Sequence, residues 1–361
     1  MAVVLPVEIG FCLGNDKLID IFILQWHTPE PFSNHTWAKM ASQDANKRRQ
    51  VLGTFQDWLH NDFDGNQPSR PLFIVAPELS VPACHVNLLD QLAEQVNRPT
   101  VIIAGLEYLT DEEYLAIRQG LSSMNELGNW QENVPVGSVV NAAAIWIHEG
   151  PNTDIRKYIQ PKCHPCDEES RYLYQGSNNL VFKSSNQMPG CHLNFCVQIC
   201  SDFNDEQNVK HLRQELAAHL TSVLDLTFLL QCNKNQEATQ LKEAIKAYFE
   251  PPDRMVQTSE GCLVCVNNAS PNIGKTTIWG KSKFCFHYIR AWRQLESPPT
   301  TFWLKDERDF DHQAAIFREP VPGIYWTTYK PHYLLRRIAG SDPRVWNFFL
   351  AFFKCLCILT L

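Results

Sequence analysis

The chain has 361 residues, which is enough for one large domain or two ordinary ones. Hydrophobic residues make up 44% of it and charged residues 20%, and this balance excludes a disordered, collagen-like or coiled-coil protein. The formal net charge of −7 argues against a protein that binds nucleic acid over its whole surface.

Thirteen cysteines are spread along the chain. In a chain of this length they are typical of reduced thiols rather than of a disulfide scaffold. The opening residues, Met-Ala-Val-Val-Leu-Pro, lack the basic leader and the apolar stretch of a secretory signal. We therefore expect a reducing, cytoplasmic compartment.

Strand and helix patterns alternate along the chain. Short apolar runs predict strands at residues 19–25, 71–76, 100–105, 142–147, 192–199, 224–230 and 262–266. Apolar residues at three- and four-residue spacing predict helices at residues 37–60, 86–96, 206–224 and 236–249. This alternation predicts an α/β fold. The Pro-rich residues 297–300 mark the clearest break, where a C-terminal extension can begin.

The last quarter of the chain differs in charge from the rest. Residues 271–361 carry 13 Lys and Arg against 7 Asp and Glu, a balance of +6, so residues 1–270 carry −13. Five of the ten tryptophans also lie there. Basic residues among aromatic ones suit single-stranded nucleic acid or an acidic partner protein, and a core or dimer interface is the simpler alternative.

The final residues 345–361 are strongly apolar. They number 17 and include Lys354, and a bilayer span needs roughly 20 apolar residues. We therefore expect them to pack inside the protein or against another subunit, with interfacial membrane contact or a tail anchor as the alternatives.

Two motifs suggest a cofactor or metal but lack the required context. Residues 269–276 fit a relaxed phosphate-loop pattern, yet no helix pattern follows to supply N-terminal amides for a phosphate. Two Cys-x-x-Cys pairs begin at Cys163 and Cys262, but the second lies in a predicted strand, where residues three apart face opposite sides. We expect neither a cofactor nor a metal.

A third set of residues points to nucleophilic catalysis. Cys200 follows the apolar run 195–199 and precedes a predicted helix, and the amides of such a turn lower a thiol pKa and can bind an oxyanion. Packing in the core is the alternative for this cysteine. Glu78 follows another apolar run and is placed to act as a general base, and Lys162 is a third candidate.

In chain order, Ala-Pro-Glu78, Lys162-Cys-His and Ile-Cys200-Ser-Asp resemble the nitrilase superfamily of carbon–nitrogen hydrolases, which use a Glu-Lys-Cys triad. Gln25 at the end of the first predicted strand and the Asn-rich turn at 267–274 also look like features of that family. The resemblance covers roughly residues 15–290.

The resemblance implies an α-β-β-α sandwich. We expect a hydrolase domain at residues 1–290 and an extension at 291–361 that serves packing or oligomerisation, in a protein that forms homo-oligomers. The resemblance also implies that the substrate of the protein is a small amide or nitrile. The basic extension is the candidate contact for a protein or nucleic-acid partner.

The same resemblance implies a role for each triad residue. Glu78 takes the thiol proton and passes protons to the leaving amine, and Lys162 stabilises the tetrahedral oxyanion. Cys200 attacks an amide or nitrile carbon and forms a thioester, which water then hydrolyses.

Neighbouring residues are expected to support this triad. Glu169, or its neighbour Glu168, matches the second carboxylate of the family and is expected to position Lys162 and the water. The main-chain amide of Ser201 is the expected second oxyanion donor. The structural alternatives are a surface carboxylate at Glu169 and, at Asp202, a cap for the following helix.

The sequence also departs from the family pattern. Ser201 stands where an aromatic residue usually follows the cysteine, and Pro165 stands where leucine usually follows the histidine. These changes leave the choice between amidase, nitrilase and carbamoylase open. A second class of function is a nitrilase-like partner or scaffold in a bacterial anti-phage defence system associated with a reverse transcriptase.

Overall fold

The structure is a computed structural model. It describes residues 2–11, 13, 18–26, 39–63, 70–127, 133–166, 169–185, 192–220, 224–233, 239–249, 261–268, 282–288, 291–293, 300–302, 310–311, 316–317 and 323–329.

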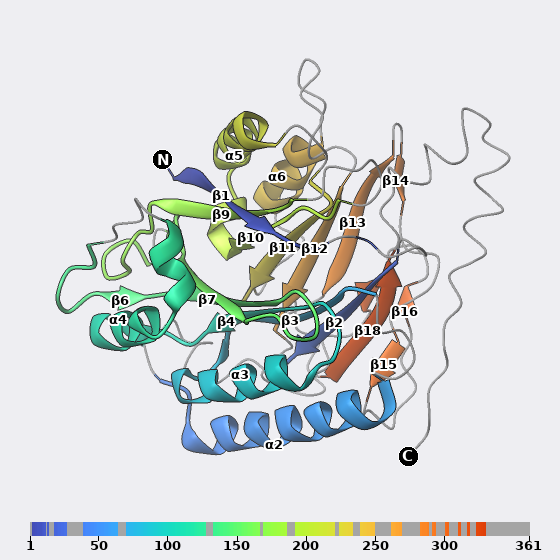
Figure 1. Ribbon diagram of the computed structural model, residues 1–361. Coiled ribbons are helices and arrows are strands. Elements are labelled where there is room, and N and C mark those ends of the chain that lie inside the picture. The colour runs from blue at the N-terminus through green and yellow to red at the C-terminus, as the bar shows by residue number, and fades with distance from the viewer. Residues whose placement is uncertain are drawn as a thin grey trace, which may run out of the picture.

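Two seven-stranded mixed sheets form the centre of the described chain (Figure 1). The first contains, in spatial order, β1 (Val3–Ile9), β9 (Asn178–Ser184), β10 (Phe195–Ile199), β11 (Leu226–Gln231), β12 (Cys262–Asn267), β13 (Lys283–Tyr288) and β14 (Ala291–Arg293). The second contains β15 (Thr300–Phe302), β18 (Gly323–Tyr329), β2 (Ile19–Gln25), β3 (Leu72–Val81), β4 (Thr100–Leu106), β7 (Ala142–His148) and β8 (Arg156–Pro161).

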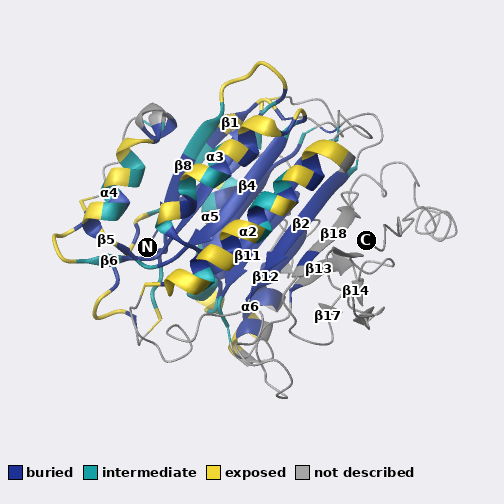
Figure 2. Cartoon of the chain, turned by 90° about the horizontal axis from the view of Figure 1, so that it is seen from below, coloured by how far each residue is buried: buried dark blue, intermediate teal, exposed yellow. Residues whose placement is uncertain are grey.

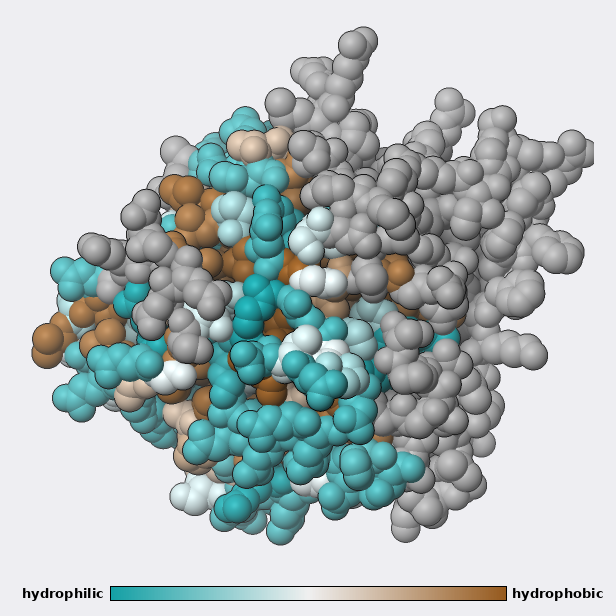
Figure 3. Space-filling model, viewed as in Figure 1, coloured by the Kyte–Doolittle hydropathy of each residue, from teal (hydrophilic) through white to brown (hydrophobic). Residues whose placement is uncertain are grey.

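Helices lie on the outer faces of both sheets. Figure 1 shows α5 (Glu206–His219) and α6 (Thr239–Phe249) beside the first sheet, and α2 (Ser42–Trp58) and α3 (Val86–Gln95) beside the second. Seen from the side of α2 and α3, their exposed residues face outward while the strands beneath are buried (Figure 2). The outer surface at α2 is mainly hydrophilic (Figure 3). Both helices are therefore amphipathic covers of the sheet.

Shorter elements complete the described chain. They are β5 (Leu109–Thr110) paired with β6 (Val139–Val140), β16 (Phe310–Asp311) paired with β17 (Ile316–Phe317), helix α4 (Asp111–Gln119), the π-helical turn η1 (Leu59–Phe63), and the 3₁₀ turns η2 (Ala83–His85), η3 (Ser122–Leu127) and η4 (Cys200–Phe203).

Aromatic side chains join the two sheets. Phe73 of β3 packs against Phe195 of β10 and Phe228 of β11, with ring centroids 5.3 and 5.1 Å apart. All three side chains are fully buried. A central strand covered on both faces is apolar along its whole length, and this explains why the sequence showed continuous apolar runs rather than alternation.

The α/β class predicted from the sequence is confirmed, and each predicted strand and helix is present; β2 has the predicted bounds, and the ends of the others are shifted. The sequence analysis missed α4, whose first turn is fixed by a capping box in which Thr110 and Glu113 bond each other's backbone amides. It also missed β1, β8 and β9. It ended the second predicted strand at Ala76, whereas β3 continues to Val81.

Part of the predicted extension lies within the second sheet. Residues Gly323–Tyr329 form β18, which pairs antiparallel with β2 along its full length. The apolar residues 345–361 lie outside the described residues, so their expected packing is a prediction. Within the described ranges, no helix has both the length and the apolar character needed to cross a membrane.

Candidate active site

Two of the three predicted catalytic residues lie directly after strand ends, and the third, Glu78, lies within β3. Lys162 follows β8, and Cys200 follows β10 of the other sheet. Strand β8 is antiparallel to β7, which is antiparallel to β4, so β8 runs in the same direction as β3, the strand that carries Glu78. The site therefore draws residues from both sheets.

The sequence predicted that Glu78 lies just beyond the end of a strand. In the structure, Glu78 lies within β3, in an irregular part of that strand. Regular pairing with β4 stops at Ala76 and resumes at Val81, and Leu79 has a φ of 55°. Such bulges re-aim a side chain. Gly105 of β4 makes room for this bulge, because a Cβ there would lie 2.2 Å from the carbonyl oxygen of Pro77 and 2.5 Å from Glu78 Cα.

We expect Gly105→Ala to destabilise the protein by about 1–3 kcal/mol, the usual effect of forced overpacking, and to displace Glu78. Urea unfolding measures the first effect, and a crystal structure of the variant measures the second. Gly53→Ala in α2 is the matched control, since a Cβ at Gly53 meets nothing within 4 Å. Equal stability of the two variants would contradict the role given to Gly105.

A buried ion network forms the centre of the site. Lys162 Nζ lies 2.9 Å from Glu78 Oε1 and 2.7 Å from Glu169 Oε2. The three residues are 1%, 2% and 9% exposed. Burial acts to lower the pKa of Lys162, but Glu78, Cys200 and Glu169 raise that pKa more, so it lies well above its usual value. The two carboxylates therefore favour the charged form of Lys162.

Besides the two bonds from Lys162, four hydrogen bonds fix the carboxylates of Glu78 and Glu169. Asn141 Nδ2 donates to Glu78 Oε1 over 2.8 Å, and the amide of Cys232 donates to Glu78 Oε2 over 2.9 Å. Tyr108 Oη donates to Glu169 Oε1 over 3.3 Å, and the Cys166 amide donates to Glu169 Oε2 over 3.1 Å. These contacts hold both carboxylates in one orientation against the lysine.

Further along the chain, two asparagines support the same strand ends. Asn268 Nδ2 donates to the main-chain oxygen of Glu78 over 2.6 Å. Asn267 Nδ2 and Oδ1 bond the main-chain oxygen and amide of Asn233, each over 3.0 Å. Ser282 Oγ donates to Gln25 Oε1 over 2.7 Å and thus links the two sheets. The predicted Asn-rich turn thus contributes directly to the support of Glu78.

Cys200 occupies a strained turn between β10 and η4. Its φ is 45°, a conformation that costs a non-glycine residue about 1–3 kcal/mol and is concentrated at functional sites. Burial raises the pKa of the Cys200 thiol well above 9.0, Glu78 raises it further, and Lys162 opposes this increase. The sequence analysis expected turn amides to lower this pKa, and that expectation was wrong because desolvation dominates. The thiol needs a base.

Four contacts of the site were not predicted from the sequence. Asn141, Cys232 and Asn268 bond Glu78, and Tyr108 bonds Glu169. Each of these four residues lies just beside a strand end. That position was the available signal, because neighbouring strand ends meet at one edge of a sheet. Glu168, the alternative to Glu169, lies outside the described residues.

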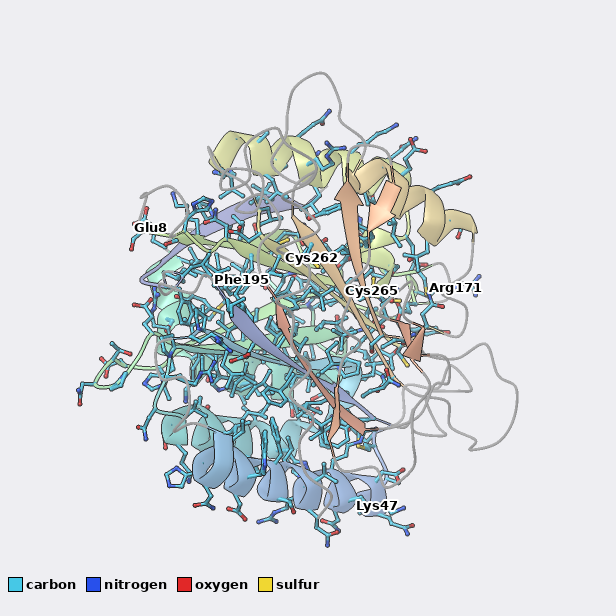
Figure 4. The ribbon with its side chains drawn as sticks, turned by 90° about the vertical axis from the view of Figure 1, so that its right-hand side faces the viewer. Glu8, Lys47, Arg171, Phe195, Cys262 and Cys265 are labelled. Carbon is cyan, nitrogen blue, oxygen red and sulfur yellow. The ribbon has the colours of Figure 1, made fainter. Side chains whose placement is uncertain are left out.

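In the described part of the chain, no group of three His, Cys, Asp or Glu side chains is placed to hold a metal ion. Cys262 and Cys265 are buried in β12 (Figure 4), and the Cys163 thiol donates to the main-chain oxygen of Asn178 over 3.3 Å. Cys84, Cys166, Cys196, Cys200 and Cys232 are free thiols. The predicted phosphate-loop residues 269–276 lie outside the described residues.

No protein-family model matches the chain, and no curated protein matches its sequence. Among solved structures, the chain is similar to a cysteine-to-alanine mutant of the amidase from Nesterenkonia sp. AN1 in complex with butyramide. The two are 13% identical, the match covers 89% of this chain and 94% of the amidase chain, and the TM-score is 0.45. The interpretation of the site therefore depends on its own residues.

Proposed function

We propose that the chain is a thiol-dependent hydrolase of a non-peptide carbon–nitrogen bond, and that it is a divergent nitrilase-superfamily member with an α-β-β-α sandwich. The observation that carries the proposal is the buried Lys162 held between Glu78 and Glu169. The charges of all three also influence the pKa of the Cys200 thiol. Burying several charged groups opposes stability, and such arrangements are concentrated at functional sites.

The thiol and the base act together in the first step. Since the pKa of Cys200 is raised, the thiol keeps its proton until Glu78 removes it during attack on the carbonyl or nitrile carbon. For an amide, Cys200 Sγ forms a bond to the carbon, the C–N bond breaks, and the proton held by Glu78 passes to the departing amine. A thioester remains, and water attacks it with Glu78 again acting as the base.

The cation stabilises the charge that develops on the oxygen or nitrogen of the substrate. Lys162 Nζ already has two carboxylate partners, and a third hydrogen remains for an oxyanion. The main-chain amide of Ser201 is the second proposed donor. Glu169 keeps Lys162 in place and positions the water. A preorganised donor of this kind contributes about 10²–10³-fold to the rate.

A substrate panel tests the proposed function. The full-length protein is incubated with short aliphatic amides, aliphatic and aromatic nitriles, and N-carbamoyl compounds, and ammonia release is measured. We expect ammonia from at least one class in the wild type. If no class gives more ammonia than the protein-free control, while Cys200 is shown by mass spectrometry to be an intact thiol, the proposal is wrong.

The pH dependence of alkylation tests the environment of the thiol. Iodoacetamide reacts with the thiolate, so the alkylation rate follows the fraction of ionised thiol. The rate for an ordinary cysteine reaches a plateau near pH 9.0, whereas the rate for a thiol with a raised pKa continues to increase above that pH. The rate at Cys200 is followed by peptide mass spectrometry, with a cysteine-containing model peptide as the reference. A rate at Cys200 that levels off below pH 9 would contradict the raised pKa.

A further inference from the structure

The turn that carries the nucleophile also holds the backbone beside the lysine. The carboxylate of Asp202 accepts three main-chain N–H bonds. Its Oδ1 accepts from Cys163 over 2.9 Å and from His164 over 2.6 Å, and its Oδ2 accepts from Ile199 over 3.2 Å. One buried side chain thus joins the segment after Lys162 to the last residue of β10.

Ser201 adds a bond in the opposite direction. Its Oγ donates to the main-chain oxygen of His164, while Asp202 accepts from the amide of the same residue. The side chains of Ser201 and Asp202 therefore hold both ends of His164. The sequence analysis considered Asp202 as a cap for the following helix, but Asp205 is the N-cap of α5, since it accepts from Gln207 over 2.6 Å.

These bonds connect two different sheets at the point where the chemistry is proposed. Lys162 directly follows β8 of the second sheet; its amide donates to the main-chain oxygen of Asn141 and its oxygen accepts from Gly176, both over 2.8 Å. Cys200 directly follows β10 of the first sheet. The chain after Lys162 leads to β9, which pairs with β10, and the bonds of Ser201 and Asp202 add direct contacts between the Lys162 segment and the Cys200 turn.

We propose that Ser201 and Asp202 are positioning residues, which act as a clamp that holds the Lys162 segment against Cys200 and so fixes the position of the ammonium relative to the thiol. This inference rests on the proposed function for its catalytic meaning. The clamp itself consists of the four hydrogen bonds and is measurable without any substrate.

Burial raises the pKa of the Asp202 carboxyl to about 7, while Lys162 and the three N–H groups act to lower it. Asp202→Asn therefore changes the local charge as well as the bonds near neutral pH. Ser201→Ala removes one bond without changing charge, so it isolates the clamp. Ser201→Thr keeps the hydroxyl and serves as the rescue variant.

The first experiment measures the rate of Cys200 alkylation by iodoacetamide against pH in the full-length wild type, Ser201→Ala and Ser201→Thr. If the ammonium moves away from the thiol, the pKa of the thiol rises. We expect the Ser201→Ala curve to shift to higher pH, with an alkylation rate about fivefold lower at a given pH, the fold-change for one hydrogen bond. Ser201→Thr is expected to stay within about twofold of wild type.

The second experiment measures amide hydrogen exchange in Asp202→Asn. The substitution replaces one carboxylate oxygen by an NH₂ group, which cannot accept a hydrogen bond. We therefore expect the amides that bonded this oxygen, either those of residues 163 and 164 or that of residue 199, to exchange about tenfold faster or more, the effect of losing a hydrogen bond to a charged group. Asp205→Asn is the matched control, because this carboxylate bonds only within its own helix start in the described contacts. It is expected to leave those amides unchanged.

The outcomes separate the clamp from the proposed function. A Ser201→Ala curve that coincides with wild type, in a variant that is only less stable to heat, overturns the positioning role. Unchanged amide exchange in a folded Asp202→Asn variant also overturns it. If the wild type hydrolyses no amide or nitrile but the Ser201→Ala curve shifts, the clamp is supported while the proposed function fails.

Discussion

Replacing Cys200 by alanine abolishes hydrolysis in our account, with a fall in kcat/KM of about 10³-fold or more, because no other group replaces the nucleophile. The fold is expected to survive, since the substitution removes one sulfur atom from a half-buried position. Ammonia release from a substrate found in the panel measures the first effect, and thermal unfolding measures the second.

Cys84→Ala is the matched control for this experiment. Cys84 is exposed, lies in η2 and makes none of the hydrogen bonds described for the ion network. We expect the full activity of the wild type in this variant. Equal loss of activity in both variants, or substantial activity in Cys200→Ala, would contradict the assignment of the nucleophile.

Replacing Lys162 by methionine is expected to remove activity and to destabilise the fold by about 3–5 kcal/mol near neutral pH. The cation is 1% exposed and has two carboxylate partners, so the variant leaves Glu78 and Glu169 as neighbouring buried charges without compensation. Urea unfolding measures the difference. Adding Glu169→Gln to Lys162→Met is expected to restore part of the lost stability, because one uncompensated charge is gone.

The single variant Lys162→Met also reverses the pH dependence of stability. In the wild type, burial acts to raise the pKa of Glu169, but Lys162 lowers it below the usual 4.5. This stabilisation is complete above pH 4.5 and is lost as the pH falls through the folded pKa. Without the lysine, burial raises the folded pKa of a carboxyl. Lys162→Met therefore gains stability relative to wild type as the pH falls from 7 to 4.

Unfolding curves for both proteins between pH 4 and 7 test this sign. Lys157→Met is the matched control, since Lys157 forms a partly exposed ion pair with Asp90, over 2.8 Å, on the outside of the sheet. Exposed pairs of this type contribute about 0–1 kcal/mol. A loss of stability in Lys162→Met no larger than in Lys157→Met would show that the buried network is not as described.

Local sequence patterns were enough to predict most of the core strands and helices. Strands such as β3, β4 and β7 are buried on both faces, so their apolar runs are continuous and easy to recognise. Strand β1, in contrast, contains Pro6 and alternates between buried and exposed positions, and its partner β9 lies far along the chain. Its pairing depends on long-range contacts, and local sequence does not encode them.

Glu78 and Cys200 could be proposed from the sequence because each stands next to an apolar strand run, whereas Lys162 follows β8, which has no such run, and was proposed from the family resemblance. The environment of these three residues could not be predicted. The bulge at Glu78 depends on the space left by Gly105, and the raised pKa of Cys200 depends on burial by residues of both sheets. Tyr108 and Cys232 become ligands of the carboxylates only after the strands are assembled. These are tertiary properties.

The most direct test of the central claim, that Glu78 activates Cys200, is acylation by p-nitrophenyl acetate at pH 7. Nitrophenolate release gives the rate, and peptide mass spectrometry locates the acetyl group. Glu94→Gln is the matched control, since Glu94 is an exposed carboxylate on α3. The account expects an acetyl thioester on Cys200 that forms about 10²-fold or more slowly in Glu78→Gln than in wild type or Glu94→Gln. An acetyl group at another residue, or acylation of Cys200 in Glu78→Gln at the wild-type rate, would contradict it.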